Sequence, residues 1–395
     1  MKMKKIPRNV FVLGLVSFFN DLSAEMIYPI VPIFLTTVLK TSIPIVGFIE
    51  GFAEATASIT KYIFGALSDY FQRRKIFVGL GYFLGALSKI CIGLATSWPL
   101  VLIARFMDRT GKGLRTAPRD SILLENTTPD DRGYIFGFHR AFDSMGAVFG
   151  PILGLILLFV MKENIRLVFF LAFIPSFIGV ILLMLMVKEK SRPNQEIKNK
   201  FVKIDFKKIP YQLRLFLIIN FIFALGNSSD AFLILRATNL GLTTILATLT
   251  YVVYNLSQTI FATPAGILAD KIGAKKVFAL GLLIFSIVYF SFGFIKNPAF
   301  IWIIFPIYGV YIAFTDGVSK AYISEFIDKK ESGSYFGLQQ TLLAVGAFLA
   351  SAIGGILWNK FSPSMTFYYG SFMSTLALMI YIISSSGKTV KVRTG

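Results

Sequence analysis

Seven charged side chains stand within sixteen residues, in the stretch RFMDRTGKGLRTAPRD at 105–120. On a helix, Arg105, Asp108, Arg109 and Lys112 recur at i, i+3, i+4 and i+7, so they share one face. Asp108 can therefore pair with Arg105 or with Lys112. The chemistry open to such a face is ion pairing, proton exchange through a carboxyl group, or anion binding by arginine and lysine. A solvated face on a soluble helix is the alternative, and the long apolar runs on both sides argue against it.

The composition indicates a membrane protein. Of the 395 residues, 55% are hydrophobic and 15% are charged, whereas a soluble domain carries about 25% charged residues. A charge inside a bilayer costs on the order of 2.5–3.5 kcal/mol, so such a charge faces protein or an aqueous interior and usually serves function. The formal net charge of +19 then reflects cytoplasmic loops held against anionic lipid. We therefore expect a lipid bilayer, and not nucleic acid, as the partner.

Histidine and cysteine are too few for most metal or nucleophile chemistry. Cys91 and His139 are the single residues of their kinds, which leaves no disulfide frame and no multi-histidine metal site. We therefore expect no metal site and no cofactor. The chain also contains no G-x-x-x-x-G-K-[ST] loop for a nucleotide, so ATP drive is not expected. A membrane enzyme using His139 with Asp143, or a receptor, is the alternative outside transport, but we predict that the chain is not an enzyme.

The elements that must position the charged stretch are predicted to be membrane-spanning helices. A membrane helix needs roughly 20 residues, and apolar runs of that order lie between polar breaks along the whole chain. We predict an all-α integral membrane protein with twelve transmembrane helices, at about 9–37, 43–68, 76–95, 99–121, 134–161, 166–187, 213–237, 242–268, 277–295, 300–324, 334–358 and 363–385.

Basic residues gather at one set of loop ends, which the positive-inside rule places in the cytoplasm. They include the N-terminal lysines, the run at 73–75 and the C-terminal tail. Both termini are therefore predicted to be cytoplasmic, in a multi-pass protein of the inner or plasma membrane. The longest polar stretch, 188–211, forms a basic cytoplasmic linker between two predicted six-helix bundles at 1–187 and 212–395.

The two predicted bundles repeat one another in sequence. GALSDYFQRRK at 65–75 matches GILADKIGAKK at 266–276, with the glycine, leucine and aspartate in register at an offset of 201. Asp108 likewise recurs as Asp316 at an offset of 208. Parallel halves joined by a central loop are a recurrent architecture of transporters.

These strings resemble the major facilitator superfamily, and the resemblance covers the whole chain. It implies twelve spans in two pseudo-symmetric six-helix bundles. The loop after span two is similar to the superfamily signature G-x-L-x-D-R-x-G-R-[RK], although Tyr70 and Gln72 depart from it. In the family this loop latches the cytoplasmic side. The implied latch residues are Gly65, Asp69, Arg73 and Arg74, with Gly266, Asp270, Gly273 and Lys275 in the second copy.

Two further elements are similar to those of the proton-coupled exporters within this superfamily. In span five, Gly146, Gly150, Pro151 and Gly154 match G-x-x-x-G-P-x-x-G, and Leu155 departs where a second glycine is usual. Tight helix packing alone explains the glycines, whereas the proline adds a bend. In span one, YPIVP resembles the P-x-x-P element. The run D-R-x-G-K-G-x-R-x-A-P-R-D in span four resembles a prokaryotic subgroup, most of whose members have no known substrate.

Acidic residues of spans one and two reach the depth of the basic face on span four. At about 1.5 Å per residue, Asp21 and Glu54 each lie about 18 Å into their spans and Lys112 about 20 Å. A carboxylate balanced between burial and a nearby cation can exchange protons near neutral pH. Permanent mutual neutralisation is the structural alternative, and His139 is predicted to be structural. The predicted proton-coupling residues are Asp21, Glu25, Glu50, Glu54 and Asp108.

We therefore predict a secondary active transporter, acting as a monomeric proton-coupled exporter of small, partly apolar molecules by alternating access. The alternative is an importer or exchanger of an anionic organic solute that binds the basic face of span four. The predicted substrate-cavity residues are Tyr28, Arg105, Arg109, Lys112, Arg115, Asp230, Asp316 and Lys320.

Overall fold

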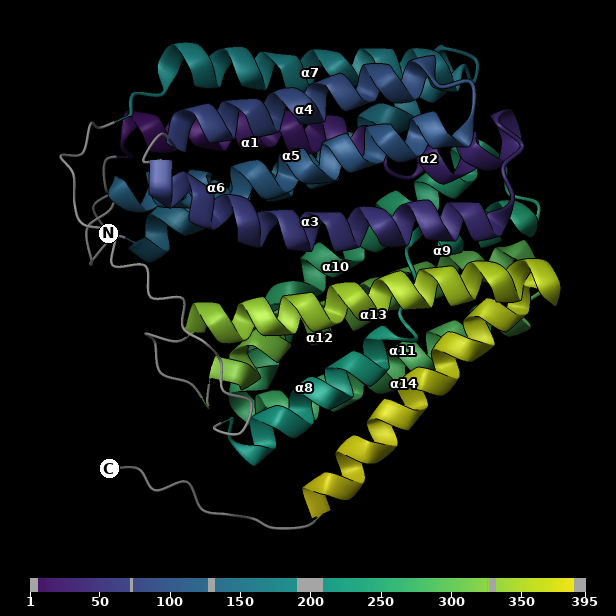
Figure 1. The fold of residues 1–395 in the computed structure, drawn as a ribbon. Coiled ribbons are helices and arrows are strands. Elements are labelled where there is room, and N and C mark those ends of the chain that lie inside the picture. The colour runs from purple at the N-terminus through teal and green to yellow at the C-terminus, as the bar shows by residue number, and fades with distance from the viewer. Residues whose placement is uncertain are drawn as a thin grey trace, which may run out of the picture. The chain divides into compact units, whose positions relative to one another are not determined.

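The computed structural model describes residues 6–71, 74–126, 132–189, 209–324, 326 and 332–386, and over these residues it is helical and contains no strand. The helices of the first half are shown in purple, blue and teal in Figure 1. They are α1 (Arg8–Ile27), α2 (Ile30–Ile33), a π-helical segment (Phe34–Val38), α3 (Ile43–Phe71), α4 (Arg74–Leu94), α5 (Trp98–Glu125), α6 (Arg132–Val160) and α7 (Ile165–Met186).

The helices of the second half have the same order and similar lengths. They are α8 (Tyr211–Ala224), α9 (Ala231–Asn239), α10 (Thr244–Ile272), α11 (Ala274–Phe294), a 3₁₀ turn (Pro298–Phe300), α12 (Ile301–Ser324), α13 (Ser332–Lys360) and α14 (Pro363–Ser386). Helices α3 and α10 both have 29 residues, as do α6 and α13, and α4 and α11 both have 21. The duplication predicted from short strings therefore extends to the lengths of the helices.

Two predicted spans are interrupted. Span one breaks at Pro29, and its last turn is π-helical; there the hydroxyl of Thr37 donates to the carbonyl of Ile33 at 2.7 Å. Span seven, predicted as one helix at 213–237, leaves helical geometry between α8 and α9. The intervening sequence LGNSSD contains glycine and short polar side chains, which compete with the helix for backbone hydrogen bonds.

Ten of the described helical segments are long and apolar enough to cross a membrane. Helix α5 is not among them although it has 28 residues, because it carries the charged stretch at 105–120. The halves of span seven are each too short to be counted. Apolarity therefore marks most of the spans, and the span richest in charge is recognised by its length and by its neighbours.

The chain divides into two compact units. Unit 1 comprises 1–200 and 231–252, and unit 2 comprises 201–230 and 253–395. The predicted bundles at 1–187 and 212–395 differ from these units, because 231–252 groups with the N-terminal part and the division falls within α10. The bundle boundaries remain a prediction.

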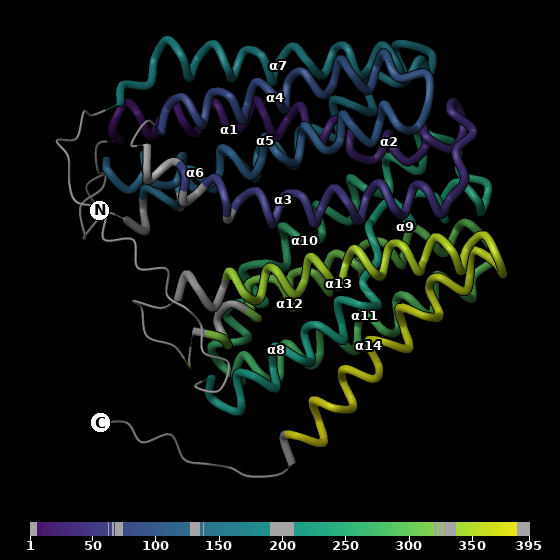
Figure 2. Tube along the Cα trace, in the orientation of Figure 1, coloured from purple at the N-terminus to yellow at the C-terminus, as the bar shows by residue number. Residues whose placement is uncertain are grey.

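In unit 1, α1 packs on α6 and α7, α4 packs on α5 and α7, and α3 packs on α5. Figure 2 traces α4 alongside α5. The two helices approach closely where Gly81 faces Gly111, since a Cβ on Gly81 would lie 2.6 Å from the Gly111 carbonyl oxygen. This contact holds the charged part of α5 against α4.

Helices α1 and α6 approach closely at the glycines of the exporter-like motif. A Cβ at Gly146 would lie 2.8 Å from the Phe18 carbonyl oxygen, and one at Gly150 would lie 2.7 Å from the Leu22 carbonyl oxygen. A Cβ at Gly154 would collide with the Met26 carbonyl. The motif therefore packs helices, as its spacing predicts, and the bend at Pro151 stays a prediction.

Candidate functional site

Basic side chains of α5 form ion pairs with acids of α3 inside unit 1. Arg105 Nη2 lies 2.5 Å from Glu50 Oε2, and the two side chains are 5% and 2% exposed. One turn further along both helices, Arg109 Nη1 lies 3.3 Å from Glu54 Oε1. The pairs follow the i, i+4 spacing of each helix, which agrees with the depths estimated from the sequence.

Asp108 pairs mainly with a residue that local spacing on α5 does not indicate. Its Oδ1 accepts from Lys89 Nζ of α4 at 3.0 Å, and its other oxygen lies 3.9 Å from Arg109 Nε. The expected pairs with Arg105 or Lys112 do not form, because Arg105 is directed to Glu50 and Lys89 approaches from the neighbouring helix. The spacing of residues on α5 cannot indicate Lys89, because Lys89 lies on α4.

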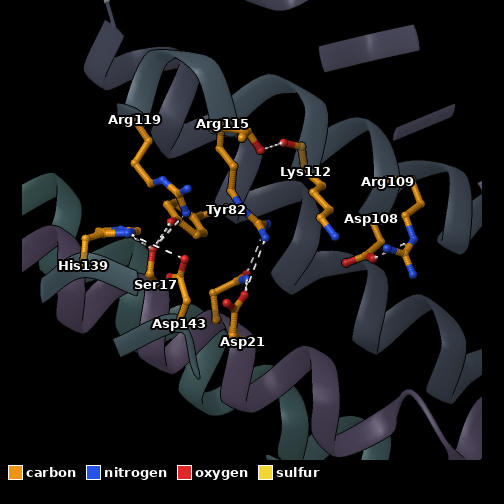
Figure 3. A network of polar contacts seen from close by, with 12 residues as sticks. Ser17, Asp21, Tyr82, Asp108, Arg109, Lys112, Arg115, Arg119, His139 and Asp143 are labelled. Atoms are coloured by element: carbon orange, nitrogen blue, oxygen red, sulfur yellow. Dashed lines mark hydrogen bonds and ion pairs between the residues drawn. The ribbon is translucent and has the colours of Figure 1, made fainter. Parts of the chain in front are cut away.

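The basic face continues toward α1. Arg115 Nη1 donates to Asn20 Oδ1 at 3.3 Å, and Arg115 Nη2 lies 3.9 Å from Asp21 Oδ1. Asn20 also donates to Asp21 Oδ1 at 3.1 Å. Figure 3 shows Arg115 directed at Asp21. The guanidinium carbon of Arg115 also lies 4.6 Å from the ring centroid of Tyr82, so the Tyr82 ring holds the guanidinium on a second side.

Two charged residues of this region form no ion pair among the described residues. Glu25 makes one hydrogen bond, from the Tyr251 hydroxyl to Oε2 at 2.7 Å. The ammonium group of Lys112 forms neither an ion pair nor a hydrogen bond with a described residue, and its side chain is exposed. Figure 3 shows Lys112 extending between the Arg115 and Asp108 groups. Within the described part of this region, Glu25 and Lys112 are therefore an acid and a cation that remain available for a proton or for a solute.

A second polar group lies nearer the end of unit 1 where α1 and α6 begin. The Ser17 hydroxyl lies 2.9 Å from His139 Nε2 and 3.1 Å from the Tyr82 hydroxyl, and it accepts from Arg119 Nη1 at 3.1 Å. His139 Nδ1 lies 3.6 Å from Asp143 Oδ2. We call these five residues the Ser17 group; all five are labelled in Figure 3.

The remaining predicted cavity residues divide between the units. In unit 1, the guanidinium carbon of Arg105 lies 5.8 Å from the ring centroid of Tyr28. The ring centroids of Tyr28 and Tyr251 are 5.3 Å apart. In unit 2, Asp230 accepts from the hydroxyls of Tyr254 and Tyr308, each at 2.6 Å. Asp316 is exposed, and the Lys320 side chain lies outside the described residues.

Part of the predicted latch is described. Arg74 pairs with Glu125 at the end of α5, and its backbone N–H donates to Glu189 Oε1 at 2.5 Å. The side chains of Gly65, Asp69 and Arg73 lie outside the described residues.

The second copy of the latch is described in full. Gly273 has φ +95° before α11, a conformation that glycine adopts without strain. Gly266 and Asp270 are exposed, and the ammonium of Lys275 lies 5.7 Å from the Tyr381 ring centroid. The roles predicted for both copies stay predictions.

Ion pairs, hydrogen bonds and isolated charges of this kind can exchange protons or hold a charged solute. Within the described part of the chain, no group of three or more His, Cys, Asp or Glu side chains could hold a metal ion. Sequence reasoning paired His139 with Asp143 but missed Tyr251, Ser17, Tyr82 and Arg119, because the partners of these four residues come from different helices. Only the helical spacing of Ser17 and Asp21, and of His139 and Asp143, pointed to shared faces.

The chain is similar to known proteins along its whole length. A sequence model of the Major Facilitator Superfamily matches residues 13–234 and 215–394. An uncharacterised MFS-type transporter of Methanocaldococcus jannaschii is 36% identical over 388 residues, which is 96% of each chain. The quinolone resistance protein NorA of Staphylococcus aureus is 28% identical over 145 residues, 37% of each chain.

Solved structures show the same fold. The nucleoside transporter NupG matches with a TM-score of 0.79 at 10% identity, covering 95% of this chain and 99% of that one. A D-xylose-proton symporter matches with a TM-score of 0.75 at 18% identity, covering 94% and 96%. The predicted all-α membrane fold with twelve spans in two related halves is thereby confirmed. The chain belongs to the Major Facilitator Superfamily.

Proposed function

We propose that this membrane transporter exports small, partly apolar molecules in exchange for protons, by alternating access. In unit 1, four membrane-embedded acids pair with four membrane-embedded cations, and these pairs fix the helices; they are Asp21 with Arg115, Glu50 with Arg105, Glu54 with Arg109 and Asp108 with Lys89. Against that background Glu25 accepts one tyrosine hydrogen bond and forms no ion pair with a described cation. A carboxyl group without a cation can take up and release a proton, and this observation carries the proposal.

Two sequence similarities support export as the direction of transport. The partial relative NorA is named for quinolone resistance, and the glycines of α6 match the exporter motif. We further propose that both termini are cytoplasmic and that the protein resides in the inner or plasma membrane as a monomer. Lysine and arginine at the predicted cytoplasmic ends support this orientation.

The proposal is tested with purified protein in proteoliposomes, a fluorescent quinolone as the probe, and an imposed pH gradient. We expect the gradient to drive accumulation of the quinolone by the unaltered protein. Glu25→Gln is expected to abolish accumulation and to leave downhill exchange. Glu163→Gln, which changes an exposed glutamate in the loop after α6, is the matched control and should behave as the unaltered protein.

The opposite outcome has a clear meaning. Accumulation by Glu25→Gln equal to that of the control would remove Glu25 from coupling. Accumulation that is indifferent to the gradient in every variant would overturn proton coupling itself. Because a quinolone is one of many possible cargoes, a panel of amphipathic organic cations and carboxylates is assayed in the same vesicles.

A second candidate function rests on Lys112. Its ammonium forms no ion pair with a described acid and its side chain is exposed, so it can receive the carboxylate or phosphate of an anionic solute. Arg105 and Arg109 are less available because Glu50 and Glu54 occupy them. This reading makes the protein an importer or exchanger of organic anions.

The two functions differ in which substitution removes binding. For an anion carrier, Lys112→Gln is expected to lose affinity for a radiolabelled organic anion at every pH, and Glu25→Gln to retain it. For a proton-coupled exporter, Lys112→Gln should retain binding of the probe and shift the pH dependence of transport, because a removed cation makes ionisation of neighbouring carboxyl groups less favourable. Binding and transport are measured over the same pH series.

A further inference from the structure

The Ser17 group forms a buried hydrogen-bond hub where four helices meet. Ser17 comes from α1, Tyr82 from α4, Arg119 from α5, and His139 and Asp143 from α6. Ser17, Tyr82 and His139 are at most 3% exposed. Asp143 Oδ1 is buried and has no hydrogen-bond partner within the described part of the chain. A buried carboxylate oxygen without a donor is costly unless it binds a proton.

The directions of these hydrogen bonds are constrained by chemistry. A serine hydroxyl has one hydrogen and two acceptor positions, whereas arginine can only donate. Arg119 therefore occupies one acceptor position of Ser17. The hydrogen of Ser17 and its second acceptor position remain for His139, Tyr82 and the Asp143 carboxylate. Two assignments keep Ser17 bonded to both His139 and Tyr82.

In the first arrangement, Ser17 donates to His139 Nε2 and accepts from the Tyr82 hydroxyl. The imidazole then carries its hydrogen on Nδ1, which faces the ionised carboxylate of Asp143 at 3.6 Å. In the second, His139 Nε2 donates to Ser17, and Ser17 donates to Tyr82. Nδ1 then presents a lone pair, and it can face Asp143 only if that carboxyl group is protonated.

The second arrangement holds one proton more than the first, and no heavy atom needs to move far between them. We propose that His139 and Asp143, joined to Ser17, form a second proton-binding site of unit 1, separate from Glu25. This inference rests on the proposed proton-coupled function. The site would hold a proton that passes between Asp21 and the end of the bundle where α1 and α6 begin. His139 then has a role beyond the structural one predicted from the sequence.

Charges of both signs surround this pair. They are Asp21 of α1, Arg115, Arg119 and Asp120 of α5, and Arg140 of α6. The neutral hydroxyl of Tyr82 from α4 completes the surroundings through its hydrogen bond with Ser17. The arginines favour an ionised carboxyl group and the two acids favour a protonated one. Asp21 follows Ser17 by four residues on α1, so it lies on the same face, and Figure 3 shows it beside Asp143. The two carboxyl groups are close enough for the charge of Asp143 to act on Asp21.

The test measures the bound proton directly and needs no substrate. Infrared difference spectra are recorded on the purified protein in lipid vesicles after steps in pH. We expect Asp143→Asn to lose one titrating carboxylic-acid band. We expect His139→Gln to lose an imidazole signal and to shift the pH at which that band titrates. Ser17→Ala should shift the same band. Ser88→Ala is the matched control, because the buried Ser88 hydroxyl bonds only within its own helix, to the Gly85 carbonyl at 2.7 Å.

Each result bears on the proposal. An unchanged carboxyl band in Asp143→Asn would overturn it, as would a band that His139→Gln and Ser17→Ala both leave in place. If Asp143→Asn does not fold, the other two variants decide the question. A negative result in the infrared titration would not affect the proposal that Glu25 couples transport to protons. That proposal is tested separately, by gradient-driven transport in Glu25→Gln.

Discussion

Lys89 Nζ lies 3.0 Å from Asp108 Oδ1, and the Lys89 side chain is 1% exposed. This ion pair joins α4 to α5 in the interior of unit 1, beside the close approach of Gly81 and Gly111. A buried ion pair of this kind stabilises the arrangement of helices when it is complete and destabilises it when one partner is missing.

Replacing only Lys89 of the Lys89–Asp108 pair should destabilise the fold more than replacing both residues with apolar ones. Lys89→Met leaves a buried carboxylate without its main cation, so we expect a loss of roughly 3–5 kcal/mol in the free energy of unfolding. Lys89→Met combined with Asp108→Leu should recover most of that loss. Thermal unfolding of the protein in detergent measures both. Equal destabilisation by the single and double substitutions would show that the pair does not act as a unit.

The Tyr251 hydroxyl is expected to set the pH at which Glu25 works. Its hydrogen bond to Glu25 at 2.7 Å stabilises the ionised carboxylate. Tyr251→Phe removes this donor, so the pH profile of gradient-driven transport should move toward higher pH. Tyr254→Phe, which removes a hydroxyl that contacts Asp230 instead, is the control. An unshifted pH profile in Tyr251→Phe would contradict this role.

The glycines of α6 can be tested through stability. Gly150→Val would place carbon atoms against the Leu22 carbonyl oxygen and the Glu25 Cβ, so we expect a loss of about 1–3 kcal/mol in stability from overpacking. Gly266→Ala is the control, because nothing lies within 4 Å of a Cβ there. The two variants are compared by thermal unfolding in detergent. A Gly150→Val protein as stable as Gly266→Ala would show that the interface is loose.

The latch prediction is tested by labelling. Asp69→Asn and Asp270→Asn should each weaken the outward-facing state, because each removes a carboxylate that helps to keep the cytoplasmic side closed. Single cysteines introduced on either face, in a Cys91→Ser background, report accessibility to a thiol reagent. If accessibility is unchanged in both variants, the two loops serve only as topology signals.

Much of this fold could be predicted because apolar length and duplicated strings are local properties. The break in span seven could not be predicted, since LGNSSD interrupts an apolar run with a single charged residue, Asp230. In the candidate site, the spacing on α5 correctly placed Arg105, Asp108 and Arg109 on one face. It could not show that Asp108 contacts Lys89, because the meeting of two helices depends on small residues such as Gly81 and Gly111, whose partners are distant in the sequence.

The contact between α1 and α6 also has a mechanical consequence. Backbone touches backbone at Gly146, Gly150 and Gly154, so neither helix can slide past the other by even one residue, about 1.5 Å, without a collision. Helices α1 and α6 are therefore expected to move together as one rigid unit when the transporter changes conformation. Asp21 on α1 and Asp143 on α6 therefore keep their relative depth in the bundle for as long as this contact is intact.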